Sequence, residues 1–488
     1  MSCAFGPWCS ALAIWFAGAT AAGDPGSAEP AVAPPPPSSS PVEPEPTSQG
    51  STPPSGVPVE STPAPEPHDT ESLPASDVTA DVPVALDVVL GCGLRLVAAQ
   101  DDTLPVAAVV LALDVGTADD PPELPGLVHA LAYHLLEGNR ELAPGASLRA
   151  VHDAGGVAHL ATSAGQVRFE SLVPLPLLSE VLRIESVRLR APTLHPERWE
   201  KALTWASRDT RPPSPLPVEV LAEVHGSPGL AHDGRIVSQE LLRLPMDRLG
   251  PLLAERFRYE RATLVVVAPQ SPVATLATVQ GWFADLPAST RIRPEPLGAP
   301  APGAAGLREL EVPAANGSTF VWPLAPDPAV LHVARVGCRT LNRMRPPADE
   351  GKSSVVRCML LPDPRFPTLV VKVEGKNDPE VTLRSRLQQL HDAEQPLLDR
   401  QRKLVARDLE RELDRPLPLA RQLATHLPPS PAPTSDGAGM RPLALLTGAA
   451  ALLPEVWRAE PLLAEVFDPA RATRLVPPPD PPGESATP

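Results

Sequence analysis

The stretch that decides the fold is Gly126–Asn139, which reads GLVHALAYHLLEGN. Three leucines in it recur at helical spacing: Leu127, Leu131 and Leu135. This periodicity predicts one buried helix, and Gly138 stands where such a helix is expected to end. His129 and Tyr133 are four residues apart, so their side chains share one face of the predicted helix. Any chemistry that the helix carries is therefore expected on that face.

The residues from His129 to Tyr133 resemble the zinc helix of the M16 (insulinase, pitrilysin and mitochondrial-processing-peptidase-like) metallopeptidases. The signature of that family is His-x-x-Glu-His, in which both histidines bind zinc and the glutamate is the general base. The resemblance places the first ligand at His129, the base at Ala132 and the second ligand at Tyr133. It places the third ligand, a glutamate in the family, at Asp209. Alanine cannot accept a proton and tyrosine is a poor zinc ligand, so the motif is degenerate.

A second register of the same motif starts at His134, where His-x-x-Glu is completed by Glu137. Gly138 then follows in place of the second histidine. The flanking glycines match the family only when His129 is the first ligand. His134 also lies about 100° further round the helix than Tyr133, so it cannot take the place of the second ligand.

Composition limits the kind of partner. The chain of 488 residues has a net charge of −16, which argues against a nucleic-acid partner because such a protein needs a basic surface. Aromatic residues make up only 3%, so the core is expected to consist mainly of leucine, valine and alanine.

The N-terminal part of the chain predicts export. Residues 1–22 are apolar and end in small residues typical of a signal peptide, although no lysine or arginine precedes Arg95. Residues 23–81 are rich in proline, serine and glutamate, and we expect a disordered spacer there. We expect an exported protein, periplasmic or extracellular. Retention of residues 1–22 as a membrane anchor stays open.

The cysteines show no metal-binding spacing. Removal of the signal would leave Cys92, Cys338 and Cys358. A bond between Cys338 and Cys358 stays open, but unpaired core cysteines are the favoured interpretation.

The order of predicted elements resembles two M16-type (LuxS/MPP-like) domains. The resemblance implies an α+β fold in which each domain is an antiparallel-rich sheet covered by helices. The expected boundaries are 82–290 for the N-terminal domain, 291–306 for a linker, 307–478 for the C-terminal domain and 479–488 for a disordered tail. A helix beginning at Ser147, with that residue as its cap, is also expected.

The resemblance also implies a place for substrate. In the family, an edge strand pairs with extended peptide, and the matching motif here consists of His159, Leu160, Ala161 and Thr162. An arginine of the second domain holds the substrate carbonyl, and Arg339 matches it, although Leu341 replaces the accompanying tyrosine. Strand addition uses backbone groups and tolerates such side-chain changes.

Two functional interpretations follow. The favoured one is a non-catalytic protein with no cofactor, which is either the partner subunit of an active M16 zinc peptidase or a binder of extended peptides. The alternative is a zinc metalloendopeptidase with a rebuilt site of His129, His159 and Asp209. A purified chain that holds zinc through His129 would favour the alternative.

Overall fold

The computed structural model describes most of the chain beyond its N-terminal region. The described residues are 83–190, 194–209, 214–232, 234, 238–292, 308–312, 318–344, 354–425, 439–453, 457, 463 and 466–478. They belong to one compact unit, 78–488. The predicted signal, spacer and C-terminal tail lie outside the described residues. Among the described residues, no helix has the length and apolar character needed to cross a membrane.

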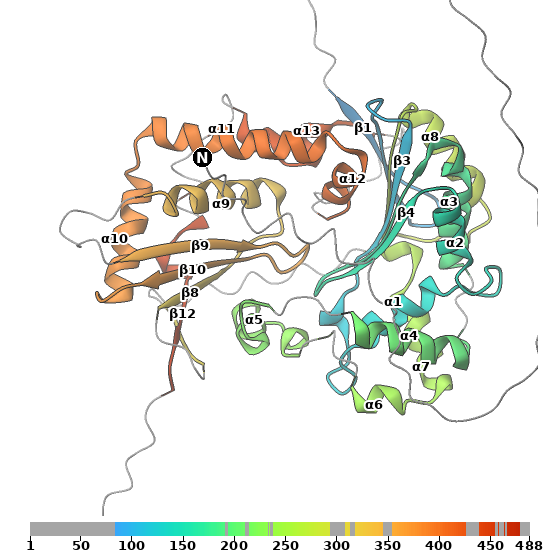
Figure 1. The fold of residues 1–488 in the computed structure, drawn as a ribbon, viewed down its shortest axis with the longest axis horizontal. Helices are drawn as coiled ribbons and strands as arrows, with labels where there is room; N and C mark the ends of the chain where they lie inside the picture. Colours follow the sequence, from blue (N-terminus) through green and yellow to red (C-terminus); the bar gives the residue numbers. More distant parts are fainter. Residues whose placement is uncertain are drawn as a thin grey trace, which may run out of the picture. The chain divides into compact units, whose positions relative to one another are not determined.

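Two sheets organise the described chain and confirm the α+β class (Figure 1). The first sheet has the order β11-β1-β2-β6-β3-β5-β4. Its strands are β1 Val84–Val89, β2 Arg95–Gln100, β3 Val106–Leu113, β4 Val157–Thr162, β5 Val167–Pro174, β6 Ala262–Ala268 and β11 Gly439–Pro442. The second sheet has the order β7-β12-β8-β10-β9. Its strands are β7 Arg308–Glu311, β8 Thr319–Pro323, β9 Val355–Leu361, β10 Thr368–Glu374 and β12 Thr473–Val476.

The second sheet repeats the topology of the first. The order β2-β6-β3-β5-β4 corresponds strand by strand to β7-β12-β8-β10-β9. In both sheets the first pair of this order is parallel and the later pairs are antiparallel. β4 and β9 are therefore equivalent edge strands, and the repeat supports the expected two-part architecture.

Helices cover both sheets because each sheet presents an apolar face that must leave water. The helices before the second sheet are α1 Leu127–Leu136, α2 Ala146–Asp153, α3 Leu178–Arg188, α4 Pro196–Arg208, α5 Val218–His225, α6 Gln239–Leu242, α7 Met246–Arg256 and α8 Pro272–Phe283. The later helices are α9 Pro328–Leu341, α10 Pro379–His391, α11 Gln395–Leu413, α12 Pro416–Thr425 and α13 Leu443–Leu446. Buried residues of α1, α3, α4 and α8 share one core with the first sheet, and α9, α10 and α11 share another with the second.

Each half also covers a sheet of the other half. α12 packs on the face of the first sheet that lies opposite α3 and α8, while β11 extends the edge of that sheet beside β1 (Figure 1). In return, Val220 and Val224 of α5 pack against Val321 and Val370 of the second sheet. The expected range 307–478 therefore contains two elements, α12 and β11, that complete the first sheet. A local pattern predicts a helix or a strand but does not say which sheet it joins.

Two local expectations are wrong. The N-cap of α2 is Gly145, with φ of 67°, and not Ser147, whose hydroxyl instead donates to the carbonyl of Leu136. Cys338 of α9 and Cys358 of β9 form a disulfide, so only Cys92 is a free cysteine among the described residues.

Candidate functional site

A buried aspartate, Asp120, binds the start of helix α1. One carboxylate oxygen of Asp120 accepts the backbone N–H of Gly126 at 2.8 Å, and the other accepts that of Val128 at 2.7 Å. These bonds satisfy two of the donors that a helix start leaves unpaired. Gly126 has φ of 87°, which a residue with a Cβ rarely adopts. Asp120 precedes α1 by more residues than a capping motif spans, so no local sequence pattern identifies it as the cap.

Burial also changes the ionisation of Asp120. Desolvation disfavours its carboxylate and raises its pKa to about 7, although the two backbone hydrogen bonds act in the opposite direction. The start of α1 is therefore expected to respond to pH in the neutral range.

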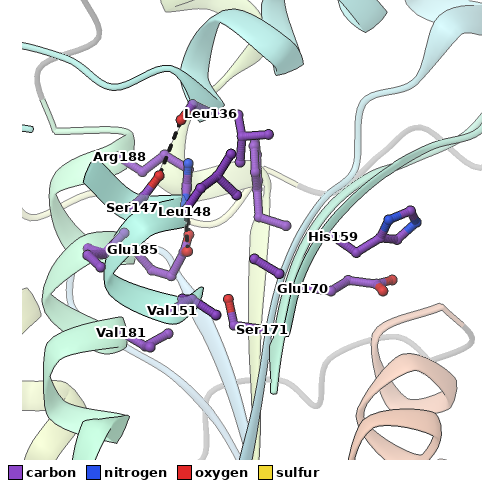
Figure 2. Close-up of a pocket in the computed structure, with 13 residues that line it drawn as sticks. Leu136, Ser147, Leu148, Val151, His159, Glu170, Ser171, Val181, Glu185 and Arg188 are labelled. Carbon is purple, nitrogen blue, oxygen red and sulfur yellow. Dashed lines mark hydrogen bonds and ion pairs between the residues drawn. The ribbon is translucent and has the colours of Figure 1, made fainter. Parts of the chain in front are cut away.

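The C-terminal end of α1 is bound to α3 through Arg188. Arg188 of α3 donates to the carbonyl of Leu135 at 3.1 Å, forms a buried ion pair with Glu185, and places its guanidinium 4.4 Å from the centre of the Phe169 ring. Figure 2 shows this region, where α2, α3 and the sheet surround a small cavity. The helix of the degenerate motif is thus held at both of its ends.

His129, Tyr133 and Asp209 lie together between α1 and the end of α4. The Tyr133 hydroxyl donates to Oδ2 of Asp209 over 3.3 Å, and Nε2 of His129 lies 3.6 Å from the same oxygen. The two rings meet edge to face with centroids 5.2 Å apart. His129 is fully buried, whereas the Asp209 side chain is 18% exposed. The positions of the three expected ligands are therefore neighbours in space, as the resemblance implies.

Ala132, at the base position, and His134, where the second register starts, do not supply the missing chemistry. Ala132, at the base position, is fully buried and offers only a methyl group. His134 is also buried and packs edge to face against Trp199, with centroids 6.1 Å apart. His134 is thus a packed helix residue that faces away from the cluster, as its position on the helix predicts.

This donor set does not fit the catalytic zinc that the resemblance implies. Such a zinc needs three protein ligands and one open position. Here the hydroxyl at the second position is bonded to the carboxylate at the third. Among the residues that the structure describes, no three His, Cys, Asp or Glu side chains are grouped in a way that could hold a metal ion.

The structure does not bring His159 to the cluster. Leu160 shares the core with α1, and side chains alternate along a strand, so His159 points to the opposite face. Figure 2 shows His159 and Glu170 on the side of the sheet away from Ser147 and Val151. The rebuilt site of His129, His159 and Asp209 is therefore not assembled, because the sheet separates His159 from α1.

β4 is the edge of the first sheet, as expected. Val157 is 56% exposed and His159 is exposed, whereas Leu160 and Thr162 are buried and Ala161 is half-buried. At the turn, the N–H of Ser163 donates to the carbonyl of Gln166. Bonded pairs alternate along an antiparallel ladder, so the N–H groups of Ala158 and Leu160 point away from β5.

Arg339 lies on α9 and forms an ion pair with Asp408 of α11, and both side chains are partly exposed. Leu341, in the place of the family tyrosine, is buried in the core of the second half. Arg339 is therefore bound to Asp408 among the helices that cover the second sheet.

Comparisons by sequence find no protein-family profile and no curated protein that matches the chain. Comparison of structures does find matches. A protease from Helicobacter pylori matches with a TM-score of 0.58 at 14% identity, over 81% of this chain and 100% of that chain. The periplasmic protease PqqL from Escherichia coli matches with a TM-score of 0.58 at 13% identity, over 80% of this chain and 47% of that chain.

An inactive M16 peptidase domain from Pseudomonas fluorescens matches with a TM-score of 0.59 at 12% identity, over 81% of this chain and 98% of that chain. These identities are low, so the likeness concerns the fold. The chain has the two-sheet fold of M16-type proteases.

Proposed function

We propose that this chain is a non-catalytic M16-type protein that works as the partner subunit of an active zinc peptidase. The observation that supports the proposal is that the expected zinc site lacks both its general base and its second histidine. Ala132 stands where a general base is needed, and the Tyr133 hydroxyl is bonded to Asp209. Peptide hydrolysis at a zinc needs a group that takes a proton from the attacking water, and the methyl group of Ala132 cannot do so.

An exposed sheet edge supports a second role, the binding of extended peptide. β4 has outward N–H groups at Ala158 and Leu160 and an exposed apolar side chain at Val157. Backbone groups at an edge bind an extended chain by strand addition, which does not depend on zinc. A non-catalytic subunit with this edge would hold a peptide and present it to the active subunit.

We also propose that the protein is exported, to the periplasm or beyond. The Cys338–Cys358 disulfide supports this location, because such bonds persist mainly in oxidising compartments. PqqL, one of the structural matches, is a periplasmic protease.

Affinity purification of the full chain from its native cells tests the partner role. We expect a second protein with an intact His-x-x-Glu-His motif in the eluate, together with peptidase activity that the chain lacks when produced alone. Recovery of the chain with no such protein, from cells in which a known control complex survives the procedure, would rule out a stable partner subunit.

Substitution Ala158→Pro tests the edge, because proline removes one outward donor and replaces only a small side chain. The matched control is Ala158→Ser, which keeps the donor. With fluorescein-labelled unstructured decapeptides as the probe, we expect about tenfold weaker binding for Ala158→Pro and unchanged binding for Ala158→Ser. Equal binding by both folded variants would show that peptide does not pair with β4.

A further inference from the structure

We propose that Tyr133 takes over the structural task of the missing metal and ties α1 to α4 through Asp209. In a zinc peptidase of this fold, a metal joins the ligand positions of the two helices. Here the bond from the Tyr133 hydroxyl to Oδ2 of Asp209 joins the same positions. The inference concerns the site alone and does not depend on a partner subunit or on peptide binding.

The reach of the two side chains supports this exchange. A tyrosine carries its hydroxyl further from the backbone than a histidine carries its ring nitrogens, and aspartate is one methylene shorter than the family glutamate. A long donor thus meets a short acceptor, and the two contact each other directly. Either replacement alone would change the distance that the two side chains must bridge between α1 and α4. With both replacements, a hydrogen bond joins the two helices.

The surroundings of the bond also fit a structural role. His129 lies beside both partners, with its ring edge-on to Tyr133 and Nε2 3.6 Å from Asp209 Oδ2. Asp209 is the C-cap of α4, and its backbone N–H bonds to the carbonyls of Trp205 and Ala206, so its carboxylate starts from a fixed position.

The chain contains only two tyrosines, Tyr133 and Tyr259, which makes the bond directly observable. The Tyr259 hydroxyl donates to the carbonyl of Ser186, away from the site. In protein labelled with ¹³C at Cζ of tyrosine, two resonances are expected, and Tyr259→Phe assigns them. We expect Asp209→Ala to shift the Tyr133 resonance and to leave the Tyr259 resonance unchanged. A Tyr133 resonance that does not respond to Asp209→Ala would overturn the proposal.

Unfolding equilibria give a second test. Tyr133→Phe keeps the ring and removes the hydroxyl, and we expect it to raise the unfolding equilibrium constant about threefold to tenfold. In the Asp209→Ala background the same substitution should have a clearly smaller effect, because this acceptor is already gone. The control Tyr259→Phe should have the same effect in both backgrounds. A Tyr133→Phe effect of equal size with and without Asp209 would overturn the proposal.

Added zinc provides the last readout. We expect zinc to leave the unfolding midpoint of the natural chain unchanged and to raise that of the double variant Tyr133→His, Asp209→Glu, which regains the family ligands. A zinc-dependent rise in the natural chain would contradict the metal-free bond. If no partner subunit is found, these three readouts keep their expected values, so the proposed function and this inference fail independently.

Discussion

The two halves of the molecule hold equivalent helices by different bonds. In the repeat, α1 follows β3 and precedes the edge strand β4, and α9 follows the equivalent strand β8 and precedes the edge strand β9. α1 depends on polar contacts, which include the Asp120 cap and the bond from Tyr133 to Asp209. α9 is joined covalently to its edge strand β9 by the Cys338–Cys358 disulfide. The same topology is thus expected to respond to pH and buried charge in the first half and to reducing agent in the second.

The largest expected effect breaks the charge network of the first half. Asp87 of β1 is buried and pairs with Arg95 of β2 at 2.7 Å and with Arg441 of β11 at 2.7 Å. These arginines hold the pKa of Asp87 below its usual range despite burial. Arg95→Met removes one of the two partners of this buried carboxylate and leaves Arg441, and we expect a loss of about 3 kcal/mol or more in the free energy of unfolding.

Urea unfolding measures this loss. Arg357→Met serves as the control, because the Arg357 side chain of β9 is 70% exposed and its ion pair is with the partly exposed Glu374. A loss for Arg95→Met no greater than that of the control would show that the first half does not depend on its buried charges.

The next effect concerns the second half. The disulfide closes a loop with a sequence separation of 20 residues, and its removal in Cys338→Ser, Cys358→Ser is expected to cost about 3 kcal/mol. Reducing agent should destabilise the natural chain by a similar amount and leave the double variant unchanged. An identical response of both proteins to reducing agent would contradict the bond.

A smaller effect is expected from the cap of α1. The pKa of Asp120 is about 7 in the folded chain, above its ordinary value of 3.8, so the folded state binds the proton more tightly than the unfolded state does. Its contribution is therefore fully present below pH 3.8 and is lost as pH rises through 7. Relative to Asp120→Asn, which cannot titrate, we expect the natural chain to lose about 2 kcal/mol between pH 5 and 8.

Asp378, the exposed cap of α10, offers the matched control for Asp120. Its pKa is lowered by backbone hydrogen bonds from Val381 and Glu380, so it does not titrate in this range. The difference between the natural chain and Asp378→Asn should stay constant from pH 5 to 8. A constant difference for Asp120→Asn as well would refute the pH-sensitive cap.

The sequence predicts elements better than it predicts their partners. Helix α1 lies within the expected stretch because its leucine spacing is a property of the chain itself. The edge position of β4 and the neighbourhood of His129 and Asp209 followed from the resemblance. The exchange of α5, α12 and β11 between the sheets was not predicted, because an apolar helix face does not specify which sheet it covers.

The contacts within the site could not be predicted from the sequence for a related reason. Asp120 acts across a loop, and the pairing of Cys338 with Cys358 follows from the packing of α9 on β9, not from a spacing motif. The bond from Tyr133 to Asp209 joins residues 76 positions apart. Each of these contacts depends on three-dimensional neighbours, which local periodicity does not report.

The zinc content of the full chain tests the central claim most directly. The chain, purified without chelator and dialysed against zinc-buffered solution, is analysed for metal beside a His129→Ala variant. Because the Tyr133 hydroxyl is bonded to Asp209, we expect far less than one zinc per chain, with no difference between the two proteins. One tightly held zinc per natural chain, lost in His129→Ala, would contradict the account and restore the zinc peptidase interpretation.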